Sequence, residues 1–176
     1  MIIILEGADG TGKTTLATKL MARMGGANIY RRATPREHVL REYTFDRITR
    51  DPIIADRWHY GELIYGPLFR TETQLTTTFF RAIDQYLRQI GALLVLVDGQ
   101  AAEIRQRILG RAENDDIDEL MMGDMLPRVL DQYREIYEWP QEVRKMRIMG
   151  PAEDHHVDEI IKHARRAYAA RHIKYD

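Results

Sequence analysis

The stretch from Gly7 to Thr14 reads GADGTGKT and matches the pattern G-x-x-x-x-G-K-[ST] at every position. A short apolar run, residues 2–5, precedes this stretch, and Leu16, Leu20 and Met24 follow it at the spacing of one helix face. Strand, glycine-rich loop and helix therefore come in the order that a phosphate-binding loop requires. This order predicts an α/β fold in which the loop joins the first strand to the first helix.

The residue types of this stretch suit the phosphates of a nucleoside triphosphate. Glycines let backbone N–H groups approach phosphate oxygens, and the helix that follows presents the positive end of its dipole. We expect Lys13 to reach the β- and γ-phosphates of ATP, and the Thr14 hydroxyl to meet the Mg²⁺ that bridges them. A glycine-rich turn before an unrelated helix is the alternative, and the flanking strand and helix argue against it. The predicted ATP site comprises Gly7, Ala8, Asp9, Gly10, Thr11, Gly12, Lys13, Thr14 and Thr15.

Apolar runs rich in β-branched residues alternate with longer segments of helical periodicity along the whole chain. This pattern is typical of a parallel sheet with helices on both faces. We therefore expect one domain over residues 1–176, with three α/β/α layers around a mainly parallel five-stranded sheet. The expected strands are residues 2–5, 28–31, 52–55, 92–97 and 147–149. Helices are expected across 75–90 and 157–168, and Thr34 to Glu37 has the pattern of a helix start.

The composition argues against several classes of site and partner. A net charge of −1 and a sequence pI near 6.6 give no broad basic surface for nucleic acid or membranes. The chain has no cysteine, which excludes disulfides and cysteine-ligated metals and suits the cytoplasm. No stretch approaches the roughly 20 apolar residues of a membrane span, and nothing resembles a signal peptide. We expect a soluble, cytoplasmic protein in which His155, His156 and His163 have surface or capping roles.

Charged residues lie at the ends of two further predicted strands. Asp56 and Arg57 follow the strand at 52–55, and Arg31 and Arg32 lie at the end of the strand at 28–31. In open α/β sheets ligands bind at the carboxyl ends of the strands, where the phosphate loop also lies. A carboxylate there can hold a water of the Mg²⁺ shell, and a guanidinium can bind an acceptor phosphate with two hydrogen bonds. The alternatives are a structural ion pair at the first position and a solvated basic pair at the second.

Both segments resemble the thymidylate kinase family and related deoxynucleoside monophosphate kinases. Residues 6–15 are similar to that family's E-G-x-[DE]-G-x-G-K-[ST]-T, and residues 56–58, Asp-Arg-Trp, are similar to its D-R-[YHF]. The resemblance implies that Asp9 lies near the hydroxyl of the acceptor sugar. It also implies that Tyr65, nine residues beyond Asp56, packs by the sugar and favours deoxyribose over ribose. The stretch from Arg31 to Pro35 is similar to the family's T-R-E-P, whose arginine meets the acceptor phosphate, and Arg32 is the favoured counterpart.

Arginines also precede a polar stretch at the place where the family has an arginine-bearing lid over ATP, here about residues 107–117. Arg107 and Arg111 are four positions apart and share a face if the helix continues through Gly110. In family members with glycine at the position of Gly10, the lid provides the arginines. Such arginines would stabilise charge on the transferred phosphoryl group. The alternative is an exposed helix face paired with acidic neighbours. The predicted catalytic residues are Lys13, Asp56, Arg57, Arg107 and Arg111, with Thr14 and Asp56 as metal ligands; the predicted acceptor site is Asp9, Arg31, Arg32, Arg57 and Tyr65.

The chain departs from the family pattern at three places. Gly61 replaces the usual serine, residues 111–116 lack the usual D-R-x-E, and the segment that in the family lines the acceptor-base pocket is short. The resemblance implies Mg²⁺-dependent transfer of the γ-phosphoryl group of ATP to a deoxynucleoside monophosphate, dTMP or a related pyrimidine nucleotide, by a homodimer. One alternative is a deoxynucleoside kinase that phosphorylates a 5′-hydroxyl with Asp9 or Asp56 as base. The other is a nucleotide-binding module that transfers no phosphate.

Overall fold

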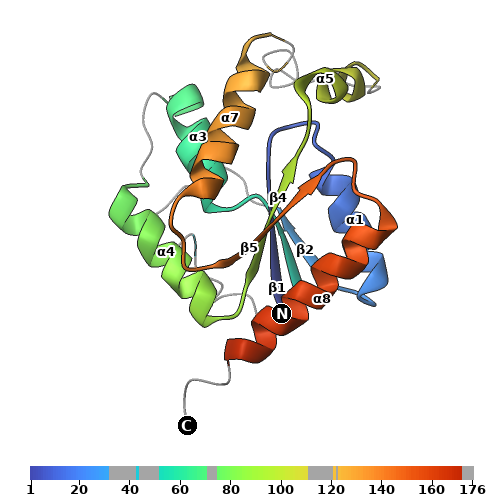
Figure 1. Ribbon diagram of the computed structural model, residues 1–176, viewed down its shortest axis with the longest axis vertical. Coiled ribbons are helices and arrows are strands. Elements are labelled where there is room, and N and C mark those ends of the chain that lie inside the picture. Colours follow the sequence, from blue (N-terminus) through green and yellow to red (C-terminus); the bar gives the residue numbers. More distant parts are fainter. Residues whose placement is uncertain (32–42, 44–51, 71–74, 111–120, 122, 172–176) are drawn as a thin grey trace.

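Five parallel strands form one sheet in the order β2-β3-β1-β4-β5. The structure is a computed structural model that describes residues 1–31, 43, 52–70, 75–110, 121 and 123–171. Every strand expected from the sequence is present, and the prediction of a parallel five-stranded sheet is confirmed (Figure 1). The strands are β1 (Ile2–Glu6), β2 (Asn28–Arg31), β3 (Ile53–Asp56), β4 (Leu93–Asp98) and β5 (Arg144–Met149).

Helices cover both faces of this sheet, as the expected three-layer arrangement requires. In Figure 1, α1 and α8 lie on one side of the strands, and α3, α4 and α7 lie on the other, with α5 beyond the end of β4. The described helices are α1 (Lys13–Arg23), α3 (His59–Arg70), α4 (Thr77–Gln89), α5 (Ala101–Leu109), α7 (Met125–Glu138) and α8 (Asp154–Ala170). The predicted helix start at Thr34 to Glu37 and most of the predicted lid, from residue 111 onward, lie outside the described residues.

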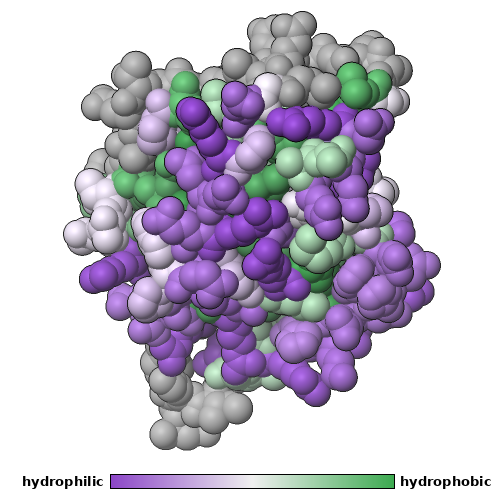
Figure 2. Space-filling view, turned by 45° about the horizontal axis from the view of Figure 1, so that its top comes forward, coloured by the Kyte–Doolittle hydropathy of each residue, from purple (hydrophilic) through white to green (hydrophobic). Residues whose placement is uncertain are grey.

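The surface is mainly hydrophilic. On the face drawn in Figure 2, hydrophilic side chains cover most of the area, and hydrophobic ones form scattered patches. Among the described residues, the large apolar side chains that are exposed are those of Leu68, Leu109 and Met149. Within the same part of the chain, the structure contains no helix of sufficient length and hydrophobicity to span a membrane.

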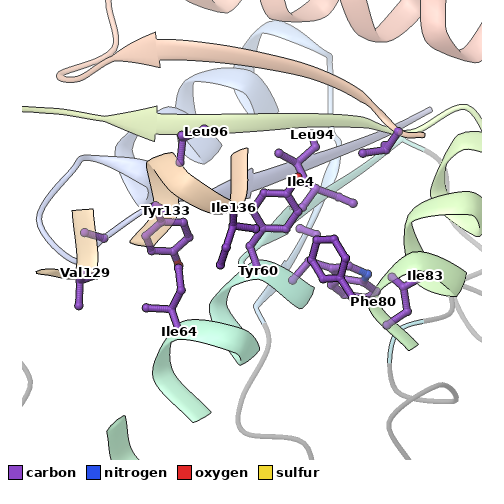
Figure 3. Packing of buried hydrophobic residues seen from close by; sticks show 14 of the residues in the cluster. Ile4, Tyr60, Ile64, Phe80, Ile83, Leu94, Leu96, Val129, Tyr133 and Ile136 are labelled. Carbon is purple, nitrogen blue, oxygen red and sulfur yellow. The ribbon is translucent and has the colours of Figure 1, made fainter. Parts of the chain in front are cut away.

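The two faces of the sheet form two hydrophobic clusters. Successive side chains of a strand point to opposite faces. Ile4 of β1 therefore packs with Tyr60, Phe80 and Tyr133 (Figure 3), whereas Ile3 belongs to the other cluster, with residues of α1 and α8. Because β1 is buried on both faces, it is apolar at every position but the last. The phosphate loop, which directly follows β1, is therefore attached to a buried central strand.

The helix predictions are confirmed where the structure describes them. The helix expected across 75–90 begins at Thr77, because the Thr76 side chain accepts a hydrogen bond from the backbone N–H of Phe79 at 3.3 Å and caps it. The helix expected across 157–168 begins at Asp154, preceded by a capping box in which the Nδ1 atom of His156 accepts from the Glu153 backbone N–H at 3.1 Å. His156 thus has the capping role expected for it.

Candidate active site

The phosphate-binding loop connects β1 to α1 and is closed by its own side chains. The Lys13 ammonium donates to the carbonyl oxygen of Ala8 at 2.6 Å, and the Thr11 hydroxyl donates to the same oxygen at 2.9 Å. Lys13 is 5 % exposed. Burial, assisted by the positive charge of Arg57, lowers the pKa of Lys13 to about 8. The ammonium is therefore desolvated and lies across the loop to which an anion would bind.

Gly10 allows α5 to pack directly against this loop. Its φ angle is +78°, and a Cβ atom there would lie 2.7 Å from Cγ2 of Ile104 and 3.0 Å from Cγ1 of Ile108. Real Cβ atoms do not approach carbon atoms so closely, and L-residues rarely adopt this backbone conformation. A residue without a side chain is thus required where the loop meets α5.

Arg107 reaches from α5 back to the loop. Its Nη1 atom donates to the Gly10 carbonyl at 3.3 Å, and its Nη2 atom donates to the Gly150 carbonyl and to the Glu103 carboxylate, both at 3.2 Å. The sequence left open whether Arg107 faces the nucleotide site or pairs with an acidic neighbour on its own helix. In the structure it lines the cavity at the phosphate loop and also pairs with Glu103. Arg111, the other predicted lid arginine, lies outside the described residues.

Asp56 and Thr14 meet where the carboxyl end of β3 faces the start of α1. The Thr14 hydroxyl donates to Oδ2 of Asp56 at 3.2 Å. A hydroxyl and a carboxylate at this distance fit the donor set of a Mg²⁺ ion that keeps several waters and binds substrate phosphates. The two predicted metal ligands are therefore adjacent, although 42 positions separate them in the sequence.

Asp9, Arg57 and Tyr65 form a second cluster beside this pair. Nη2 of Arg57 forms an ion pair with Oδ1 of Asp9, and the Tyr65 hydroxyl donates to Oδ2 of Asp9 at 3.1 Å. The guanidinium of Arg57 also lies 4.7 Å from the centre of the Tyr65 ring, which is a cation–π contact. Burial alone would raise the pKa of Asp9, but the charges of Arg57 and Lys13 outweigh it and hold the pKa below its usual value. Asp9 is therefore ionised at neutral pH.

The loop, the Thr14–Asp56 pair and Arg57 surround one cavity of about 290 Å³. Most of the predicted site residues line it: Asp9, Gly10, Gly12, Lys13, Thr14, Thr15, Asp56, Arg57 and Arg107. Tyr65 contacts two of these residues from α3. Arg31 pairs with Asp56 in the register of β2 and β3, so its backbone lies at this sheet edge. Arg32 lies outside the described residues.

A second hollow, of about 450 Å³, lies between α1 and α8 and shares no residue with the first. Its basic residues are exposed, and Arg23 is held by Asp158 through two hydrogen bonds of 2.9 Å. We attach no catalytic role to this hollow, because it contains neither the phosphate loop nor a buried polar group.

Sequence reasoning missed the buried acids that end two of the strands. Glu6 ends β1 and is fully buried, and its Oε1 atom accepts from the backbone N–H groups of Trp58 and Tyr60 at 2.8 and 3.0 Å. Asp98 ends β4 and accepts from Nε of Arg134 at 3.0 Å and from Arg147. The available signal was an acid directly after an apolar strand, since such a carboxylate is buried and must have partners.

The sheet order, the loop between β1 and α1 and the cavity at the carboxyl edge define the fold of P-loop kinases. No protein-family model matches the sequence, and no curated protein sequence matches it significantly. The likeness is to solved structures. The YorR protein of Bacillus subtilis, in complex with phosphorylated GDP, is 22 % identical with a TM-score of 0.75, and the match covers 100 % of both chains.

Two further structures extend the comparison. Deoxyadenosine kinase of M. mycoides with bound dATP is 16 % identical with a TM-score of 0.60, and the match covers 94 % of this chain and 100 % of that one. Thymidylate kinase of Candida albicans is 18 % identical with a TM-score of 0.55, covering 96 % of this chain and 93 % of that one. Identities at this level show the shared fold. The expected α/β fold is thus confirmed, and thymidylate kinase is one of several kinases with the same architecture.

Proposed function

We propose that this chain transfers the γ-phosphoryl group of ATP to a deoxynucleoside monophosphate, dTMP or a related pyrimidine nucleotide, and so forms the diphosphate. One observation carries the proposal. Lys13 of the phosphate loop and Arg57 after β3 line the same cavity, with the Thr14–Asp56 pair between them. Two cations that enter one hollow from different elements suit two anionic substrates that meet there.

The donor and acceptor would bind from opposite flanks of this cavity. The backbone N–H groups of the loop, Lys13 and Arg107 suit the β- and γ-phosphates of ATP, whereas Arg57 suits the phosphate of the acceptor. In the transfer, an oxygen of the acceptor phosphate bonds to the γ-phosphorus while the bond from that phosphorus to the β,γ-bridging oxygen breaks, and ADP leaves. The acceptor is already an anion, so the step needs no covalent intermediate on the protein. Catalysis is then in-line positioning and neutralisation of charge.

Thr14 and Asp56 would hold Mg²⁺, Thr14 through its hydroxyl and Asp56 directly or through a water. An ion held by these two residues would neutralise part of the charge that develops during transfer. The ionised Asp9 and the Tyr65 hydroxyl, 3.1 Å apart, suit the hydroxyl and the ring of the acceptor sugar. Burial raises the pKa of Tyr65, so its hydroxyl stays protonated and able to donate.

A deoxynucleoside kinase is the second candidate. The carboxylate of Asp56 lines the cavity, where it could accept the proton of a 5′-hydroxyl, and one of the similar structures is a deoxyadenosine kinase. The guanidinium of Arg57, which lines the same cavity, favours the monophosphate, because a cation beside the acceptor site suits a charged acceptor more than a neutral hydroxyl. A single domain over residues 1–176, a homodimer and a cytoplasmic location remain predictions of the sequence.

The test is release of ADP from ATP and Mg²⁺ with a panel of deoxy- and ribonucleoside monophosphates and free nucleosides. We expect turnover with dTMP or a related deoxynucleotide. Turnover with nucleosides alone would support the second candidate, and no turnover with any acceptor would leave a binding module. Lys13→Ala should abolish activity, whereas Lys19→Ala, a lysine of the same helix paired with Asp154 at the surface, should retain it. Near-normal activity of Lys13→Ala would contradict the site.

A further inference from the structure

Glu6 joins the end of β1 to the start of α3. Its Oε1 atom accepts from three backbone N–H groups, those of Trp58 at 2.8 Å, Tyr60 at 3.0 Å and Gly61 at 3.4 Å. Its Oε2 atom accepts from the Tyr133 hydroxyl at 3.4 Å. The side chain is fully buried and does not line the cavity. Glu6 therefore acts on the protein's own backbone rather than on a substrate.

The three amide groups are those that a helix start leaves without intrahelical partners. Helix α3 begins at His59, and the first N–H groups of a helix have no carbonyl four residues earlier to bind. A carboxylate at this position is also stabilised by the positive end of the helix dipole. Glu6, at the end of β1, thus caps the start of α3, although more than 50 positions separate it from the residues that it holds.

The residue just before the capped segment is a strained residue of the site. Among the residues that the structure describes, Arg57 is the one non-glycine residue with a positive φ, +70°. An L-residue in this conformation is destabilised by about 1–2 kcal/mol, so the surrounding contacts must maintain it. The backbone N–H of Arg57 donates to the Leu5 carbonyl at 2.8 Å, and the amides of the next residues donate to Glu6. The last two residues of β1 therefore hold the turn from both sides.

We propose that Glu6 is a positioning residue, which holds the turn at Arg57 and through it aims the guanidinium at the acceptor phosphate. This inference rests on the proposed phosphoryl transfer. Without the three hydrogen bonds the turn at Arg57 relaxes, and the guanidinium leaves its place between Asp9 and Tyr65. Lys13 belongs to α1 and is held by the carbonyl oxygen of Ala8, so the ATP flank keeps this part of its geometry. The loss of activity should therefore appear in the binding of the acceptor and in kcat.

Two substitutions distinguish the effect of the length of the Glu6 side chain from the effect of its charge. Glu6→Gln keeps an oxygen at the same distance and loses the charge, whereas Glu6→Asp keeps the charge and is one methylene too short to reach all three amides. Tyr133→Phe is the matched control, because it removes only the contact to Oε2. In steady-state kinetics we expect Glu6→Asp to lower kcat/KM for the acceptor by about 10²-fold, the effect of a displacement near 1 Å. The KM for ATP should stay within about twofold, and Glu6→Gln should lose less than about tenfold, the value of one hydrogen bond.

Amide hydrogen exchange gives a readout that does not depend on activity. The amides of Trp58, Tyr60 and Gly61 should exchange faster in Glu6→Asp and at near wild-type rates in Glu6→Gln. Equal acceptor kinetics in the two variants, or an equal loss for ATP and acceptor, would overturn the inference. If Glu6→Asp does not fold, Glu6→Gln alone still tests the inference. Faster exchange of the three amides in Glu6→Gln, or a 10²-fold fall in its kcat/KM for the acceptor, would overturn the inference as well. If the wild-type protein transfers no phosphate, the proposed function is refuted instead. Amide hydrogen exchange then still tests whether Glu6 holds the start of α3.

Discussion

Adding a methyl group at Gly10 should push α5 away from the phosphate loop. The new Cβ atom of Gly10→Ala would lie 2.7 Å from Ile104 and 3.0 Å from Ile108, both of which are fully buried in the core. Neither side chain can move without displacing its neighbours, because interiors are closely packed. We therefore expect the helix, and Arg107 with it, to shift away from the loop.

The loss of stability has two parts, and a second glycine separates them. Alanine at a φ of +78° is strained by about 1–2 kcal/mol, and overpacking a core position adds about 1–3 kcal/mol. Gly25, just after α1, has a similar φ of +72°, and a Cβ atom added there would meet no other atom within 4 Å. Gly25→Ala should therefore lose only the backbone part. The difference between the two variants is the packing of α5 on the loop.

Urea unfolding of both variants measures this difference as a change in the free energy of unfolding. We expect Gly10→Ala to be less stable than Gly25→Ala by about 1–3 kcal/mol. A fall in ATP affinity should accompany this loss in Gly10→Ala alone, since Arg107 contacts the Gly10 carbonyl. Equal stabilities of the two variants would refute the claim that α5 is seated on this glycine.

Two further predictions concern the acceptor flank and the dependence on pH. Tyr65→Ala should reduce the ratio of kcat/KM for deoxy- over ribonucleotides by about tenfold, and an unchanged ratio would count against its place by the sugar. Burial raises the pKa of Glu6 from 4.5 to about 7. Between pH 4.5 and 7, Glu6 is therefore protonated in the folded state and ionised in the unfolded state. Stability from this group is complete below pH 4.5 and lost as pH rises through 7, by up to about 3 kcal/mol. Urea unfolding between pH 5 and 8 should show this fall in the wild type and not in Glu6→Gln; parallel curves would contradict it.

The sequence predicts four of the five strands to within one residue at each end, and it misses the start of the fifth, β5. β1, β3 and β4 are buried on both faces, so their residues are almost all apolar and the pattern is continuous. Among the described strands, β5 has β4 as its one neighbour. It begins with Arg144 and Lys145, which suit an exposed edge but interrupt the apolar pattern by which a strand is recognised. Its predicted start therefore came three residues too late.

The donor half of the candidate site was predictable because it is nearly contiguous. Residues 7–15 carry the glycines, the lysine and the hydroxyl in one motif, and Lys13 contacts the Ala8 carbonyl only five positions away. The position of Asp56 was predictable from a simple rule, namely that residues after parallel strands gather at one edge. Its contact with Thr14 agrees with that rule.

The acceptor half depends on contacts that no local pattern reports. Arg57 meets Asp9 across 48 positions, and Tyr65 meets the same carboxylate across 56. These contacts exist only once β1 and β3 are paired and the turn at Arg57 has taken its positive φ. The loop that would bind ATP can thus be recognised from its own residues, whereas the groups that would bind the acceptor are brought together by the pairing of β1 with β3 and by the cap that Glu6 provides. For this reason a motif can indicate the phosphate loop, whereas the contacts that join Asp9, Arg57 and Tyr65 are seen only in the folded chain.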